Sequence, residues 1–126
     1  MSAVVVQFPG KAPEAAPERH PAQYAQDLSF MAFLEPKGTG INYWSVTPSG
    51  HYVTDWETGE RLAKEYLDYI GRYPTHGHKT LLGSIVNDMI LRGKAGREHL
   101  SGVEIGFLHS INGVTMATAA WLAGAR

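Results

Sequence analysis

The spacing of apolar residues changes once along this chain, from a period of two to a period of about 3.6. Between Leu28 and Trp56, short apolar and aromatic runs alternate with Gly and Pro clusters, which is typical of strands and turns. From Leu62 to Trp121, apolar residues recur at the spacing of amphipathic helices. The order of the two patterns predicts an α+β fold, in which a short antiparallel β-meander is followed by three α-helices.

Three runs are expected to form the meander. Residues 28–34 form an apolar run closed by a Gly- and Pro-rich turn at 36–40, and a helix over the same run is the competing interpretation. Residues 41–47 and 51–56 are rich in aromatic and β-branched side chains, and Pro48-Ser49-Gly50 separates them. That turn sequence predicts a β-hairpin between the second and third strands.

Two helices are predicted in the middle of the chain. The first ends before Pro74 and carries its apolar face at Leu62, Tyr66, Tyr69 and Tyr73, with Thr54 and Glu57 spaced as a capping box near its start. The second runs from Lys79 to Gly93. We expect its core residues to be Leu81, Leu82, Ile85, Val86, Met89 and Ile90.

The third helix is predicted to begin at a capping box formed by Ser101 and Glu104. Its apolar face is expected at Val103, Phe107, Ile111, Val114 and Trp121. Polar residues such as His109 and Asn112 interrupt it, so we expect a buried helix and no membrane span. Small residues along it admit another backbone at close range, which fits either packing within one chain or a dimer seam: Gly102, Gly106, Gly113, Ala117, Ala119, Ala120 and Ala123.

The N-terminal residues have a different composition. Pro9, Pro13, Pro17 and Pro21 recur in an Ala-rich stretch without large aliphatic side chains. Because proline favours extended backbone, residues 1–27 are predicted to be a flexible Pro/Ala-rich arm, and residues 28–126 a single globular domain. Residues 3–8 have strand propensity and form either a docking strand or a frayed tail.

Composition limits the classes of function. Of 126 residues, 44% are hydrophobic, and 11 basic residues nearly balance 12 acidic ones, which argues against disorder and against a polyelectrolyte partner. The chain has no cysteine, which excludes disulfides and thiolate chemistry and fits a cytoplasmic location. No secretory signal is recognisable at the N-terminus.

A metal site is one candidate for chemistry. His76 and His78 flank a glycine, so both rings could reach one metal ion if Asp55, His51 or Asp88 supplied a third ligand. This pair would support a metal-dependent enzyme for hydrolysis or oxidation. The alternative is a polar loop that joins two helices, and no catalytic residue set is predicted.

A nucleic-acid site is a second candidate. Arg92, Lys94 and Arg97 form the one basic concentration, in a connection between two apolar helices. However, Glu104 lies at the end of the following helix that would enter a groove, and the net charge is −1. These observations argue against nucleic acid as a partner.

A partner-binding surface is the third candidate. The proposed hairpin carries Tyr43, Trp44, Tyr52 and Trp56, and helices can cover only one face of so small a sheet. At least one aromatic residue is therefore expected to be exposed, with Tyr52 and Trp56 favoured, and exposed aromatics often anchor interfaces. We interpret the chain as a non-enzymatic protein-interaction or regulatory domain without a cofactor, whose partner is another protein or a second copy in a homo-oligomer.

Overall fold

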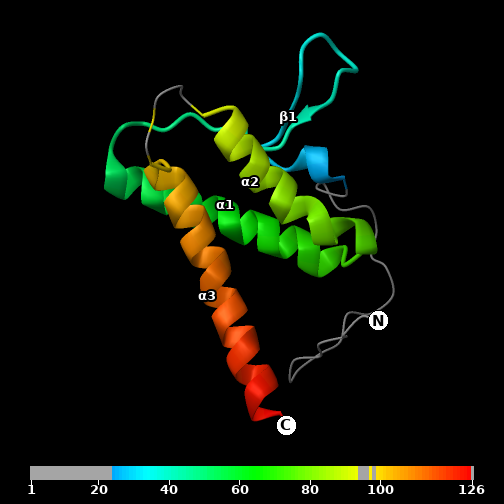
Figure 1. The fold of residues 1–126 in the computed structure, drawn as a ribbon, viewed down its shortest axis with the longest axis vertical. Helices are drawn as coiled ribbons and strands as arrows, with labels where there is room; N and C mark the ends of the chain where they lie inside the picture. The colour runs from blue at the N-terminus through cyan, green and yellow to red at the C-terminus, as the bar shows by residue number, and fades with distance from the viewer. Residues whose placement is uncertain (1–23, 94–96, 98, 126) are drawn as a thin grey trace.

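The computed structural model describes residues 24–93, 97 and 99–125, so residues 1–23 of the predicted arm, with the possible strand at 3–8, lie outside it. The described residues form three α-helices and a small two-stranded sheet, and Figure 1 shows the arrangement of the helices around β1. The elements are η1 (Ala25–Asp27), β1 (Ala32–Phe33), β2 (Ile41–Asn42), α1 (Tyr52–Arg72), η2 (His76–Thr80), α2 (Leu81–Leu91) and α3 (Gly102–Gly124). An antiparallel sheet with three helices confirms the α+β class.

The three-stranded meander is wrong, because the predicted third strand is the beginning of a helix. The sheet pairs β1 with β2, with Ala32 opposite Asn42 and Phe33 opposite Ile41. The predicted turn at 36–40 joins these strands, and Gly38 and Gly40 there adopt positive φ angles. Residues 28–31 are irregular backbone rather than strand, although Leu28, Phe30 and Met31 are buried.

Helix α1 starts at Tyr52, well before the predicted helix. The Thr54–Glu57 capping box does not form, since the N-cap residue is His51. The helical period extends back through Gly59 and Asp55, both of which are buried. Glycine is a weak helix former, but Gly59 allows the α1 backbone to contact α3 closely.

The core lies where α1, α2 and α3 meet the chain between Leu28 and Trp44. At its centre, Phe107 of α3 contacts the rings of Phe30, Trp44 and Tyr66, with centroid distances of 5.6, 4.9 and 5.9 Å. Burying this much aromatic surface stabilises the fold strongly, since each large ring contributes several kcal/mol when it is removed from water. Trp44 is therefore a core residue.

Helix α2 follows the prediction except at its C-terminal end. Leu81, Ile85 and Met89 are buried, and Leu82 and Val86 are partly buried. The prediction that Ile90 is a core residue is wrong, because 66% of its surface is exposed. Ile90 directly follows Met89, so the helix turns it away from the core by about 100°.

Helices α1 and α3 cross in very close contact. A Cβ atom placed on Gly59 would lie 2.2 Å from the carbonyl oxygen of Val103, and one on Gly106 would lie 2.4 Å from the carbonyl oxygen of Trp56. Only glycine allows the two backbones to approach this closely. The small residues at the start of α3 thus serve packing within one chain.

Beyond Ile111, α3 leaves the body of the molecule (Figure 1). Val103, Phe107 and Ile111 are buried as predicted, but every residue from 112 to 117 is exposed. The predicted apolar face continues to Val114. However, α1 crosses α3 at an angle, so it does not cover this face beyond Ile111. Within the described part of the chain, no helix is sufficiently long and apolar to cross a membrane.

Candidate interaction surface

Three aromatic rings lie together on the surface where α1 begins and crosses α3. The ring centroids of Tyr52 and Trp56 are 5.9 Å apart, and those of Trp56 and His109 are 4.7 Å apart. Tyr52 is 57% exposed, Trp56 is half-buried and His109 is exposed. We call these three residues the aromatic cluster. Rings held by each other and still open to solvent are suitable anchors for a partner.

Asp55 fixes the start of α1 and thereby places the cluster. Its buried carboxylate accepts hydrogen bonds from the backbone N–H of Ser49 at 2.9 Å, the Ser49 hydroxyl at 2.7 Å and the backbone N–H of Gly50 at 3.2 Å. The hydrogen bonds from Ser49 lower the pKa of Asp55. The Pro48-Ser49-Gly50 segment is therefore tied to the first turn of α1 instead of joining two strands.

Glycine in α3 makes room for the same region. A Cβ atom on Gly102 would lie 3.0 Å from Cβ of Asp55 and 3.2 Å from the ring of Tyr52. These distances are tighter than ordinary van der Waals contacts, so a larger residue would displace the start of α1. The cluster thus depends on both helices.

The structure separates the four aromatic residues predicted to bind a partner. Tyr52 and Trp56 are on the surface as favoured. Trp44 is only 5% exposed and lies in the core, so its assignment to a partner surface is wrong. Tyr43 is partly buried against the core, and its backbone N–H donates to Asp88 at 2.7 Å.

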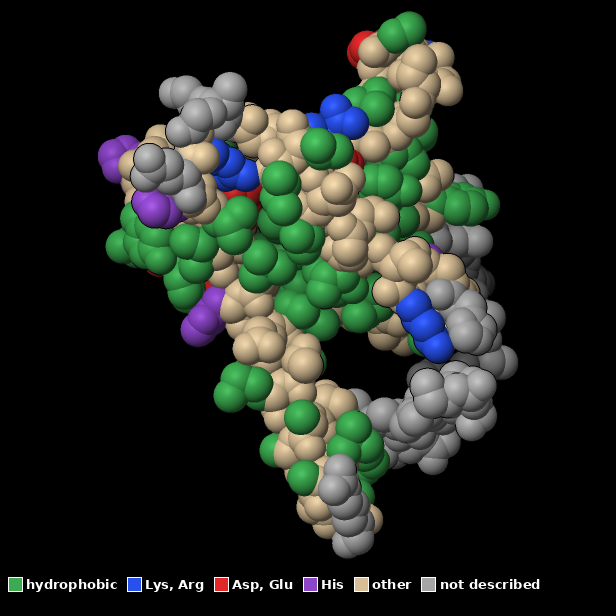
Figure 2. All heavy atoms as spheres, viewed as in Figure 1, with side chains coloured by type: hydrophobic (Ala, Val, Ile, Leu, Met, Phe, Trp, Pro, Cys, Tyr) green, Lys and Arg blue, Asp and Glu red, His purple; other side chains and the backbone are tan. Residues whose placement is uncertain are grey.

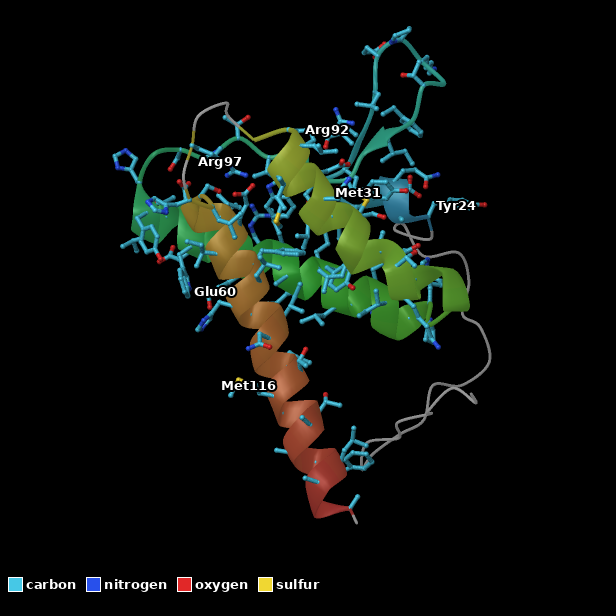
Figure 3. All side chains as sticks on the ribbon, in the orientation of Figure 1. Tyr24, Met31, Glu60, Arg92, Arg97 and Met116 are labelled. Atoms are coloured by element: carbon cyan, nitrogen blue, oxygen red, sulfur yellow. The ribbon has the colours of Figure 1, made fainter. Side chains whose placement is uncertain are left out.

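The projecting end of α3, residues 112–124, is continuous with the cluster, and we call it the α3 tip. Met116 is 64% exposed and points away from the helix axis in Figure 3, two turns beyond His109. Between Ile105 and Ala125 the sequence has no Asp, Glu, Lys or Arg. On the face drawn in Figure 2, hydrophobic side chains lie along the projecting end, and no described charged side chain lies among them.

His78 is engaged in hydrogen bonds within the fold. Its Nδ1 contacts the carbonyl oxygen of Tyr73, which only accepts, so Nδ1 carries a proton and donates. Its Nε2 lies 3.0 Å from the hydroxyl of Tyr69. Burial raises the pKa of Tyr69, with further contributions from Tyr73 and Asp27, which keeps this hydroxyl protonated. Metal binding by His78 would have to break these contacts.

Two of the expected third ligands, Asp55 and Asp88, make other contacts. Asp55 binds the turn before α1, and Asp88 binds Tyr43 and lies 3.6 Å from Arg92. Among the residues that the structure describes, no three His, Asp or Glu side chains could together hold a metal ion. The side chain of His76 lies outside the description, so the His76–His78 site stays a prediction.

The basic connection between α2 and α3 is largely structural. Arg97 donates to the buried carboxylate of Glu104 and to the carbonyl oxygen of Met89, and it lies between the end of α2 and the start of α3 (Figure 3). Glu104 also accepts from the N–H of Ser101, and so completes the predicted capping box. Arg97 is therefore not available to a phosphate.

The other two basic residues add little to a nucleic-acid site. Arg92 lies near Asp88, one helical turn before it, and Lys94 is outside the described residues. No two free basic side chains are thus brought together by the described part of this connection. Nucleic-acid binding remains an untested alternative without geometric support.

Sequence reasoning missed His109 and Met116 as surface residues. It treated His109 as an interruption of an apolar helix, although His109, Gly113, Met116, Ala120 and Ala123 recur at alternate spacings of four and three. Such spacing places residues on one face of a helix. This spacing in the sequence could have identified His109 and Met116 as residues of one helix face.

No protein-family model matches this chain, and neither a curated protein nor a solved structure matches it significantly.

Proposed function

We propose that this chain is a non-enzymatic protein-interaction domain, with the aromatic cluster as its binding surface. The observation that carries the proposal is the surface cluster of Tyr52, Trp56 and His109, whose rings contact each other in tilted geometry and which is continuous with the uncharged α3 tip. Interface cores are enriched in Tyr and Trp and depleted of charge. The composition and position of this surface fit a protein partner.

The rigidity of the surface supports the same function. The Asp55 hydrogen bonds fix the start of α1, and the glycine contacts at Gly59 and Gly106 fix α3 against it. An anchor that is already ordered loses little conformational entropy on binding. This body would hold the cluster in place while a partner docks, and the cysteine-free composition fits a cytoplasmic setting.

Site-specific photo-crosslinking tests this function. A benzophenone side chain at Tyr52 should cross-link to a protein in the cells from which the chain comes. The same probe at Lys64 provides the matched control, because Lys64 is exposed on another face of α1. A discrete cross-linked protein, or a cross-linked pair of this chain, from Tyr52 but not from Lys64 is the expected result. If the probes at Tyr52 and Lys64 cross-link equally, or neither cross-links, the proposed interaction function is contradicted.

A further inference from the structure

The α3 tip exposes apolar side chains on several sides at once. Val114 is 46% exposed, Met116 64% and Leu122 38%. The apolar residues of α3 do not form a single stripe but surround the helix. A helix that is apolar all round is normally covered by protein, since each exposed aliphatic side chain forfeits the free energy of burial.

We propose that a second copy of this chain covers the face of the tip that carries Met116, with the two α3 helices antiparallel about a two-fold axis near Met116. The proposal rests on the proposed function and specifies the partner of the same surface. In this arrangement the tip of each copy lies against the aromatic cluster of the other.

The first argument is complementarity in size along one face of α3. His109, Gly113, Met116, Ala120 and Ala123 share that face. Its N-terminal end is bulky, because Trp56 contacts His109 and Tyr52 contacts Trp56. Its C-terminal end carries only alanines. Antiparallel pairing about Met116 brings the bulky end of one copy against the small end of the other, so the surface is complementary to itself, as a two-fold interface requires.

The second argument is charge. No Asp, Glu, Lys or Arg occurs between Ile105 and Ala125, so two copies of this helix meet without like-charge repulsion. A partner with a strongly charged surface would lose hydration there without gaining an ion pair. The α3 helix of a second copy is an uncharged surface that this helix can accept.

The area that a stable dimer must bury favours the antiparallel orientation. The tip is about 20 Å long, and a helix face about 10 Å wide gives roughly 200 Å² of projected contact. Stable interfaces bury about 800 Å² on each partner. Contact between two tips alone is thus too small. Antiparallel pairing adds the aromatic cluster on both sides of the axis.

A charge placed at the axis tests the proposal. Met116→Glu puts two carboxylates against each other in the dimer, whereas Thr115→Glu adds the same charge about 100° round the helix. Both residues are exposed, so both variants should stay folded by circular dichroism. By sedimentation velocity between about 1 and 100 μM, the full chain and Thr115→Glu should form dimers. Met116→Glu should dimerise at least about a hundredfold more weakly.

Cysteine variants test the orientation, because the chain has no cysteine of its own. Under mild oxidation, Met116→Cys should form a disulfide-linked dimer. Ala123→Cys should not link to itself, but it should link to His109→Cys when the two variants are mixed. Thr115→Cys should give no dimer. Efficient linkage of Ala123→Cys to itself would contradict the antiparallel arrangement.

Other occupants of the tip give different results. A full chain that is monomeric at every concentration overturns the proposal, and so does equal weakening by Glu at positions 115 and 116. If that monomer still cross-links from Tyr52 to a different protein, the inference fails while the proposed function stands. If it cross-links to no protein, both fail.

Discussion

The two halves of α3 are both largely apolar but have different surroundings. From Gly102 to Ile111, the helix contributes Phe107 to the centre of the core and meets α1 so closely that Gly106 has no room for a Cβ atom. From Asn112 onward, the same apolar face continues without α1, and nothing lies within 4 Å of a Cβ built on Gly113. Periodicity identifies an apolar face, whereas the helix crossing decides which part of that face α1 covers.

The largest expected difference between the halves comes from two side chains on the same face. Phe107→Ala should lower the free energy of unfolding by about 3–5 kcal/mol, because it removes a ring that three other rings contact and leaves a cavity. Val114→Ala, two turns later, should change it by no more than about 0.5 kcal/mol. Urea titration of both variants measures this. Similar losses would show that the second half is also packed.

The start of α3 should also depend on its buried ion pair. Arg97→Ala leaves the carboxylate of Glu104 buried without its cation and should cost about 2–3 kcal/mol, below the range for fully buried pairs because Arg97 is partly exposed. Arg92→Ala is the control and should cost less than about 1 kcal/mol, since Arg92 is more exposed and lies farther from Asp88. Thermal unfolding of both variants provides the measurement. Equal costs would mean that Arg97 does not hold α2 to α3.

Two glycine substitutions should have opposite effects. Gly106→Ala should lower stability by about 1–3 kcal/mol, because the new Cβ atom would overlap the backbone of Trp56. Gly113→Ala should raise stability by about 0.5–1 kcal/mol, because alanine favours helix and has space there. Chemical denaturation of the two variants compares them. If Gly113→Ala lowers stability, the Cβ atom at position 113 must meet another part of the protein, which contradicts the open space at this position.

The smallest expected effect is the pH dependence contributed by Asp55. Its pKa is lower in the folded chain than the ordinary 3.8, so its contribution is fully present above about pH 4 and is lost as pH falls through the folded pKa. Asp55→Asn should lower the melting temperature at neutral pH and reduce its decline between pH 4 and 2. Calorimetry across this range tests the sign. An unchanged decline in the variant would assign the acid sensitivity to other carboxylates.

The sequence predicted the helices better than the sheet. Helical faces such as Leu62–Tyr66–Tyr69 are set by local spacing and remained correct. The hairpin prediction was wrong because a Pro-Ser-Gly segment can precede either a strand or a helix. The contact of Gly59 with α3 and the binding of Asp55 to Ser49 favour the helix after it. Tyr52 and Trp56 were grouped correctly for the wrong reason, since four residues bring side chains to the same face in both a strand and a helix.

Exposure of the tip could not be predicted from the sequence. Val114 continues the spacing of Val103, Phe107 and Ile111, and nothing local distinguishes it from them. Its exposure follows from the point at which α1 diverges, which is a property of the whole fold. His109 joins the aromatic cluster for the same reason, because only the crossing brings Trp56 beside it.

Hydrogen exchange along α3, read by mass spectrometry at several protein concentrations, tests most directly that the two halves have different partners. Amides between Val103 and Ile111 should stay protected at every concentration, because the fold of one chain covers them. Amides between Gly113 and Gly124 should exchange rapidly in dilute solution and become protected as the concentration rises. Protection of the tip equal to that of the first half in the most dilute sample, or no protection in the most concentrated one, would contradict this account.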